Sequence, residues 1–82
     1  MRYTVTWAQS AQNELATIWI YALDQTAVTV ATHQIDSALR VDAHCKGQEV
    51  DEGRILYNWP LGVIFTVSPD DCLVEVIQVW HL

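Results

Sequence analysis

Positive charge is scarce in this sequence. Only four of its 82 residues are Lys or Arg, against ten Asp and Glu, so the formal net charge is −6. Proteins that bind nucleic acid through backbone phosphates usually carry an excess of Lys and Arg, because neutralising phosphates supplies most of the affinity. The overall field of this chain therefore repels RNA, DNA and anionic membranes, and leaves only a local basic site open.

Long apolar runs and cysteines are also lacking. No apolar run approaches the ~20 residues that a membrane-spanning helix needs, and the first ten residues, MRYTVTWAQS, lack the apolar core of a signal peptide. The two cysteines, Cys45 and Cys72, form neither a C-x-x-C pair nor a disulfide framework, so we expect both to be reduced. These absences predict a cytoplasmic protein without a membrane span.

The first half of the chain predicts one strand and two helices. Polar and apolar side chains alternate over residues 2–7, which is typical of a half-buried strand. Ser10 is the expected N-cap of a helix over 11–23, and Thr26 is the expected cap of a second helix whose apolar stripe ends at Leu39. The short break between them predicts an antiparallel helical hairpin.

The second half predicts a loop followed by three strands. Residues 42–53 show no clear period and mark the loop, and three β runs follow at 53–59, 61–67 and 72–80. Their short connections predict an antiparallel meander. The whole chain, residues 1–82, is then a single α+β domain of order β-α-α-β-β-β, with the helical hairpin packed on an antiparallel sheet.

Alternation within the strands assigns side chains to two faces of the sheet. If residues 68–71 form a four-residue loop, Phe65 lies opposite Val74. The face that we expect under the helices carries Ile55, Tyr57, Trp59, Leu61, Val63, Phe65, Val67, Val74, Val76, Gln78 and Trp80. The solvent-exposed face then receives Arg54, Asn58, Thr66, Glu75 and His81.

Several stretches together resemble the RelE/ParE superfamily: YTVTW and NELATIW near the start, IDSAL in the second helix, then EGRILYNWPLGVIFTV and VEVIQVWHL. These are the small toxins of bacterial toxin–antitoxin modules, often labelled plasmid-stabilisation proteins. The resemblance covers nearly the whole chain, and its motifs are mostly patterned hydrophobic residues. It implies a growth-inhibiting toxin that is held silent by a cognate antitoxin. RelE-like members cut mRNA in the ribosomal A site, whereas ParE-like members act on DNA gyrase.

The resemblance makes Arg54 and His81 the catalytic candidates, since both match positions where the family's nucleases carry basic residues or histidine. Leu56, Gly62 and Leu82 stand where such nucleases often carry a basic or aromatic residue. Cleavage through the RNA 2′-hydroxyl needs a base, an acid and a cation, and this set is incomplete here. The expected register also separates Arg54 from His81 by roughly 20 Å.

Three functions follow from the resemblance and stay open. We favour a toxin that is ParE-like or catalytically reduced; the alternatives are a ribosome-dependent mRNA endoribonuclease and a decayed, non-toxic antitoxin-binding module. The implied partners are a cognate antitoxin and either the ribosome with its mRNA or DNA gyrase, and a homodimer is left open. In a structural interpretation, Arg54 is a solvated charge paired with Glu52 or Glu75, and His81 is a terminal residue without a role.

Trp19 is the expected antitoxin contact, because it lies at the edge of its helix stripe and exposed aromatic side chains are favoured at interfaces. The spacing of Asp42, His44 and Cys45 matches no zinc-ligand pattern, and Lys46-Gly47 alone is a weak phosphate-binding signal. We therefore expect no metal and no cofactor.

Overall fold

Two helices and five strands account for most of the chain. The computed structural model describes all residues from 1 to 82. The elements in chain order are β1 (Thr4–Trp7), α1 (Gln9–Tyr21), α2 (Gln25–Leu39), a 3-10 turn (Ala43–Cys45), β2 (Gln48–Val50), β3 (Gly53–Asn58), β4 (Leu61–Ser68) and β5 (Leu73–His81).

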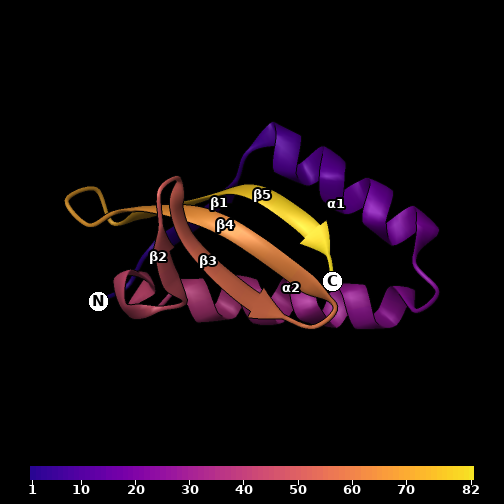
Figure 1. Cartoon of the computed structure of the whole chain (residues 1–82). Coiled ribbons are helices and arrows are strands. Elements are labelled where there is room, and N and C mark those ends of the chain that lie inside the picture. The colour runs from indigo at the N-terminus through magenta and orange to yellow at the C-terminus, as the bar shows by residue number, and fades with distance from the viewer.

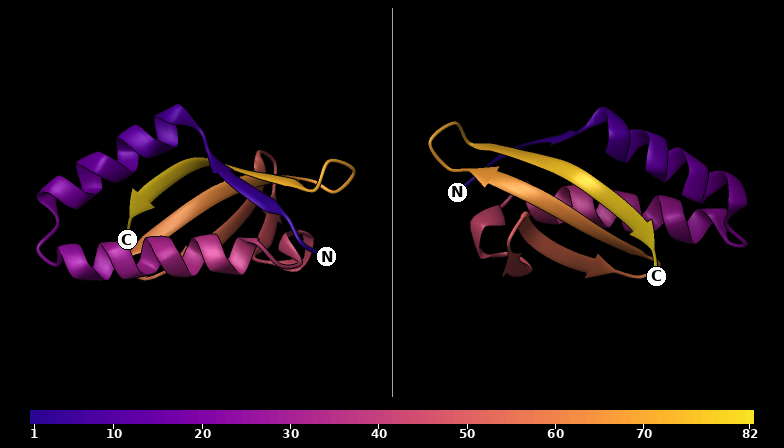
Figure 2. Two further views of the ribbon diagram at one scale, coloured as in Figure 1. Left: turned by 180° about the vertical axis from the view of Figure 1, so that it is seen from behind. Right: turned by 45° about the horizontal axis from the view of Figure 1, so that its top comes forward.

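The five strands form one sheet in the order β1-β5-β4-β3-β2 (Figure 1). Strands β3, β4 and β5 form the predicted antiparallel meander, while β1 pairs in parallel with β5. The α+β fold with a helical hairpin on one face of the sheet is therefore confirmed, and the sheet is mixed instead of wholly antiparallel. Both helices lie on the same face, and the views in Figure 2 show α2 lying along the sheet while α1 diverges from α2.

The predicted loop contains structure that the sequence pattern did not reveal. Strand β2 pairs antiparallel with the start of β3, with Gln48 opposite Ile55 and Val50 opposite Gly53. Gly47 leads into β2 with φ +64°, and a Cβ built there would lie 2.0 Å from the Ile55 carbonyl oxygen. Only glycine fits this close approach, so Gly47 allows the loop to fold back against β3.

Both predicted helix caps were wrong. Helix α1 begins at Gln9 after Ala8, without a side-chain cap, and Ser10 lies inside its first turn. Helix α2 is capped by Asp24, whose carboxylate accepts a hydrogen bond from the Ala27 amide at 3.0 Å. A carboxylate three residues ahead of a free amide is the better cap, so Thr26 is left inside the helix.

The side chains of β3 lie on the opposite faces of the sheet from those predicted. Its turn to β4 pairs Asn58 with Leu61, and Leu61 is fully buried under the helices. Because facing residues share a side of the sheet, Leu56 points to the core and Tyr57 points to solvent. Arg54 and Asn58 accordingly share the side of Leu56, and neither Tyr57 of β3 nor Trp59 just after it enters the core.

A register shift between Ile64 and Phe65 also corrects the prediction for β5. Phe65 pairs with Val76 instead of Val74, whereas Ile64 pairs with Gln78. The extra residue in β5 is typical of a β-bulge, and it reverses the alternation beyond that point. Val79 therefore enters the core, while Gln78 and Trp80 turn to the open face of the sheet. Thr66 and Glu75 are exposed, as predicted, and the register shift places them opposite each other.

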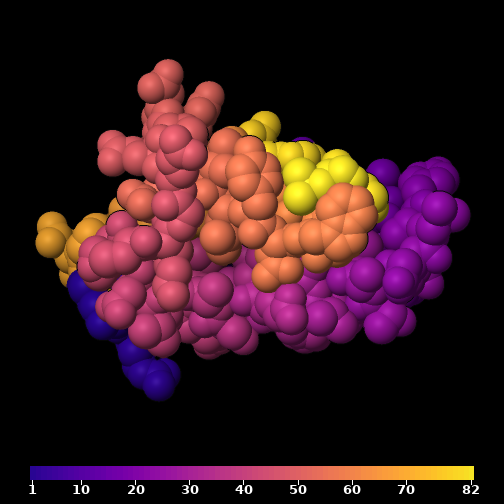
Figure 3. Space-filling view, turned by 60° about the horizontal axis from the view of Figure 1, so that its bottom comes forward, coloured from indigo at the N-terminus to yellow at the C-terminus, as the bar shows by residue number.

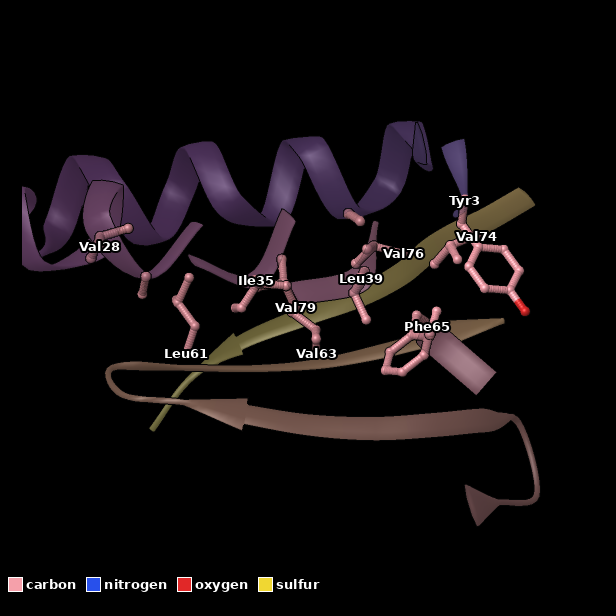
Figure 4. Close-up of a cluster of buried hydrophobic side chains, with 13 residues drawn as sticks. Tyr3, Val28, Ile35, Leu39, Leu61, Val63, Phe65, Val74, Val76 and Val79 are labelled. Carbon is pink, nitrogen blue, oxygen red and sulfur yellow. The ribbon is translucent and has the colours of Figure 1, made fainter. Parts of the chain in front are cut away.

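The core lies between α2 and the middle of the sheet (Figure 4). Phe65 is its largest fully buried side chain, and Ile35 and Leu39 of α2 are also fully buried. Tyr3, just before β1, closes one end of this cluster with 5% of its surface exposed, while Val5 and Trp7 of β1 pack against the cluster. The alternation predicted over residues 2–7 is confirmed. Neither helix is long and apolar enough to cross a membrane.

The orientation of β3 gives a direct test. We expect Leu56→Ala to lower the free energy of unfolding by about 2 kcal/mol, because it removes a side chain packed on the core. Tyr57→Ala should cost about 1 kcal/mol or less, since Tyr57 is exposed and loses mainly its contact with Trp80. Urea denaturation of both variants measures the difference, and a larger loss for Tyr57→Ala would contradict the register.

The cap of α2 gives a second test. Asp24→Ala should destabilise the protein by about 1 kcal/mol, because the Ala27 amide loses its partner, while Asp24→Asn should keep most of the stability. Thr26→Ala is the control, since Thr26 makes no capping bond. Thermal unfolding midpoints would distinguish these variants, and a loss confined to Thr26→Ala would show that the helix begins elsewhere.

Candidate functional site

An apolar groove of about 690 Å³ lies between the two helices and β1. The helices are joined at one end and diverge toward the other, and β1 crosses the open end (Figures 1 and 2). Seven of the 12 lining residues are hydrophobic. They come from all three elements: Val5, Thr6 and Trp7 of β1; Gln12, Leu15, Ala16, Trp19 and Ile20 of α1; and Val28, Thr29, Thr32 and His33 of α2.

Strand β1 presents a free edge to this groove. Three consecutive residues of β1 line the groove although their side chains alternate, so the strand contributes its backbone as well. The Thr4 amide donates to the Cys72 carbonyl just before β5, and the Ala8 amide donates to the Val76 carbonyl of β5. The amides of the intervening Val5 and Trp7 therefore point away from β5. The other end of this edge is already closed, because the Tyr3 amide donates to the Arg40 carbonyl. Gln12 Nε2 donates to the Trp7 carbonyl at 2.9 Å, so the amides of Val5 and Trp7 are the groups of this edge that remain free at the apolar groove.

Trp19 lines the groove and is 44% exposed. Its indole N–H donates to the Thr29 hydroxyl at 3.2 Å, and this bond links α1 to α2 across the groove. Three further apolar side chains at this end of the hairpin are still more exposed: Ile20 at 63%, Tyr21 at 81% and Leu23 at 107%. Contiguous exposed apolar side chains of this kind mark an interaction surface on a small domain.

Arg54 does not stand free on a wet face. Its Nε donates to the Lys46 carbonyl at 2.7 Å, and its Nη2 lies 3.3 Å from the Gly47 carbonyl. The loop that β2 adds thus supplies partners that the sequence did not indicate, and no ion pair forms with Glu52 or Glu75. The carbonyl groups of Lys46 and Gly47 face a cation of the same chain, so this pair does not cradle a phosphate.

His81 is the last residue of β5 and lies opposite Leu61. Its ring packs edge-on to Trp59, with centroids 6.2 Å apart, and the next amide, of Leu82, donates to the Pro60 carbonyl at 2.8 Å. The strand end is thereby held in place. Arg54 lies opposite Phe65, four positions from Leu61 along β4, which is about 13 Å at the usual rise per residue. The structure does not bring Arg54 and His81 together.

Comparison with known proteins relies on the fold. No family model matches the chain, and no curated protein is similar to it in sequence. A chain of the toxin–antitoxin complex RelBE2 from Mycobacterium tuberculosis superposes with a TM-score of 0.77 at 13% identity, covering 100% of this chain and 93% of that one. A chain of the chromosomal ParDE toxin–antitoxin system from P. aeruginosa gives 0.65 at 17% identity, covering 99% and 97%.

The chain shares the fold of these two chains. The face of the sheet opposite the helices is open, and none of the five strands places a Lys or Arg on it. The open face is lined instead by residues that are mainly apolar or uncharged: Ile55, Tyr57, Gly62, Ile64, Thr66, Glu75, Gln78 and Trp80. A phosphate bound on this face would therefore have no Lys or Arg side chain of the strands beside it.

An aromatic pair occupies the middle of the open face. Tyr57, Gly62 and Trp80 form one row across β3, β4 and β5. A Cβ on Gly62 would lie 2.7 Å from the Trp80 ring, so the indole rests directly on the glycine backbone. The Tyr57 ring stands edge-on to it, with centroids 6.3 Å apart. At Gly62, where the resemblance places an arginine in nucleases of this fold, the structure therefore holds a packed indole.

The residues considered for a metal site have other contacts. The Asp42 carboxylate lies 2.6 Å from the Met1 amine, and the His44 Nδ1 lies 2.8 Å from the Tyr3 hydroxyl. No group of three or more His, Cys, Asp or Glu side chains is arranged to hold a metal ion. His44 instead joins the 3-10 turn to β1, through the buried hydroxyl of Tyr3.

Tyr3 predicts a pH dependence of stability. Burial raises the pKa of the Tyr3 hydroxyl above its ordinary value near 10, and the neighbouring Cys72, Asp42 and Cys45 raise it further. The folded state therefore holds the phenolic proton more tightly than the unfolded state. This contribution to stability is complete below about pH 10 and is lost as the pH rises through the folded-state pKa.

We expect the wild type to be more stable than Tyr3→Phe at about pH 8, with a difference that shrinks above about pH 10. Urea denaturation of both proteins across this range measures the difference. Since Phe cannot ionise, a difference that stays constant or grows with pH would contradict the assigned environment of Tyr3.

Proposed function

We propose that the chain is the toxin component of a type II toxin–antitoxin module, that a cognate antitoxin neutralises it by binding the helix groove, and that it inhibits growth without cutting RNA. The proposal rests on one observation above all: a fold shared with chains of two toxin–antitoxin systems presents an open sheet face without a Lys or Arg. Transfer or cleavage of a phosphodiester needs positive charge where the negative charge develops.

The groove fits a polypeptide segment. An extended segment lying along β1 would satisfy the free amides of Val5 and Trp7 while its side chains enter the apolar space between the helices. Trp19 and Ile20 offer the large exposed surfaces that usually dominate binding energy. This combination supports an antitoxin segment as the occupant of the groove.

The second candidate function is ribosome-dependent mRNA cleavage. It is favoured by a polar depression that is separate from the apolar groove. His44, Glu49 and Arg54 line a polar depression of about 450 Å³ beside the β2–β3 turn, and they supply an acid, a base and a cation. Asp51 and Glu52 line the same hollow and oppose the approach of a phosphate. His81 lies at the other end of the sheet and does not contribute to it. We therefore rank this candidate second.

Brief induced expression in a bacterial host separates the candidates. Incorporation of labelled methionine and labelled thymidine would be followed side by side, together with the integrity of total mRNA. We expect thymidine incorporation to fall first, with mRNA intact, as for a ParE-like target. Arg54→Ala should remain as toxic as the wild type.

Other outcomes would identify the alternatives. An early fall in methionine incorporation with cleaved mRNA, abolished by Arg54→Ala, would establish the nuclease instead. If soluble protein accumulates and neither label changes, the chain is a non-toxic binding module.

The groove itself is tested with two matched variants. We expect Ile20→Glu to weaken capture of the product of a neighbouring short reading frame about tenfold or more, because a carboxylate would be buried against an apolar segment. Val30→Glu is the control, since Val30 is an exposed aliphatic residue of α2 that does not line the groove. Titration calorimetry measures both, and equal losses would place the partner elsewhere.

A further inference from the structure

A smaller pocket, separate from the groove and from the polar depression, lies where α1 and α2 are joined, away from the open end of the groove. It has a volume of about 400 Å³ and is enclosed by the α1–α2 turn, the β3–β4 turn and the end of β5. The bond from the Leu82 amide to the Pro60 carbonyl holds the last two segments together. In the space-filling view the C-terminal residues (yellow) lie beside this turn (orange) and next to the helical hairpin (Figure 3).

Three rings line the pocket: Tyr21, Trp59 and His81. Trp59 and His81 are fixed edge-on to each other at 6.2 Å. Tyr21 is 81% exposed and Trp59 is 71% exposed, so most of both ring surfaces is open to an incoming group. Exposed aromatic rings that gather in one place on a small domain mark an interaction site.

The charged groups of the pocket favour a cation. Asp24 is the only acidic residue in the lining, and no Lys or Arg lines it. One Asp24 oxygen caps α2 through the Ala27 amide, and no hydrogen bond occupies the other. The C-terminal end of α1 and the N-terminal end of α2 both lie here, and their opposite partial charges offset each other, so the Asp24 carboxylate supplies the charge of the pocket. Besides Asp24, the titratable side chains that line the pocket are Tyr21 and His81.

We propose that this pocket binds an arginine side chain of a partner polypeptide. The guanidinium would pair with the Asp24 carboxylate and stack on the Tyr21 and Trp59 rings. Guanidinium suits this site better than ammonium, because it is planar, less strongly hydrated and stacks on aromatic faces. An apolar side chain would leave the Asp24 carboxylate covered and unpaired, which is unfavourable. The net charge of −6 also draws a basic segment to the protein.

The inference does not depend on the proposed toxin function, and it is tested on the isolated full chain. The probe is Nα-acetyl-arginine methylamide, titrated at about pH 7.5 while amide and indole N–H resonances are followed by NMR. We expect saturable shifts at Leu23, Asp24 and the Trp59 indole in the millimolar range. The isosteric, uncharged citrulline derivative should bind about fivefold more weakly or worse.

Two variants complete the test. Asp24→Asn removes the charge while Asn remains a good helix cap, so we expect α2 to stay folded and the arginine probe to bind about fivefold more weakly. Asp70→Asn makes the same change in net charge on the β4–β5 turn, remote from the pocket lining, and should leave binding unchanged. Equal binding of the two probes, no shift with either, shifts centred elsewhere or full affinity in Asp24→Asn would each overturn the proposal.

Discussion

The turn between β3 and β4 determines which side chains of the sheet face the helices. It leaves Asn58 opposite Leu61, and Leu61 is fully buried. Every residue of β3 is thereby assigned to a side, since alternation along a strand has a period of two. Tyr57 consequently stands on the open face, and the bulge beside Phe65 sends Trp80 to the same face from β5. Two local features of the backbone thus create the aromatic open face.

The β3–β4 turn and the bulge also determine on which side of the sheet Arg54 and His81 lie. Arg54 and His81 both lie on the helix side of the register, but at opposite ends of it. Arg54 is satisfied by backbone oxygens of the loop before β2, and His81 is packed on Trp59. A fold that elsewhere accompanies toxin–antitoxin systems therefore has, in this chain, surfaces suited to protein contacts: an apolar groove with a free strand edge, and an aromatic pocket with one carboxylate.

Sequence periodicity was sufficient for both helices and for four of the five strands, and for the order of these six elements. The amphipathic stripes of the two helices, the alternation of β1 and the meander all follow from which residues are apolar, because burial drives each of them. The caps were less predictable. Asp24, Ser10 and Thr26 are all good capping residues, and the choice among them depends on where the chain turns, which packing determines.

Strand β2, the bulge and the orientation of β3 were not predictable from the pattern. β2 has only three residues and owes its place to Gly47, while the bulge leaves no mark in the composition of β5. One side of β3 and its turn carries Ile55, Tyr57 and Trp59, and the other side carries Arg54, Leu56 and Asn58. The first set is the more hydrophobic, so hydrophobicity alone favoured the wrong side. Of the candidate site residues, Trp19 lies in the groove, whereas the partners of Arg54 come from the loop that was expected to be irregular.

We propose that this chain binds its partner through the groove and the β1 edge, and not through the open face of the sheet. Hydrogen–deuterium exchange of the chain, alone and in complex with the product of a neighbouring short reading frame, tests it most directly. We expect new protection at the amides of Val5 and Trp7 and along α1 in the complex. Protection confined to the strands around Tyr57 and Trp80 would contradict it.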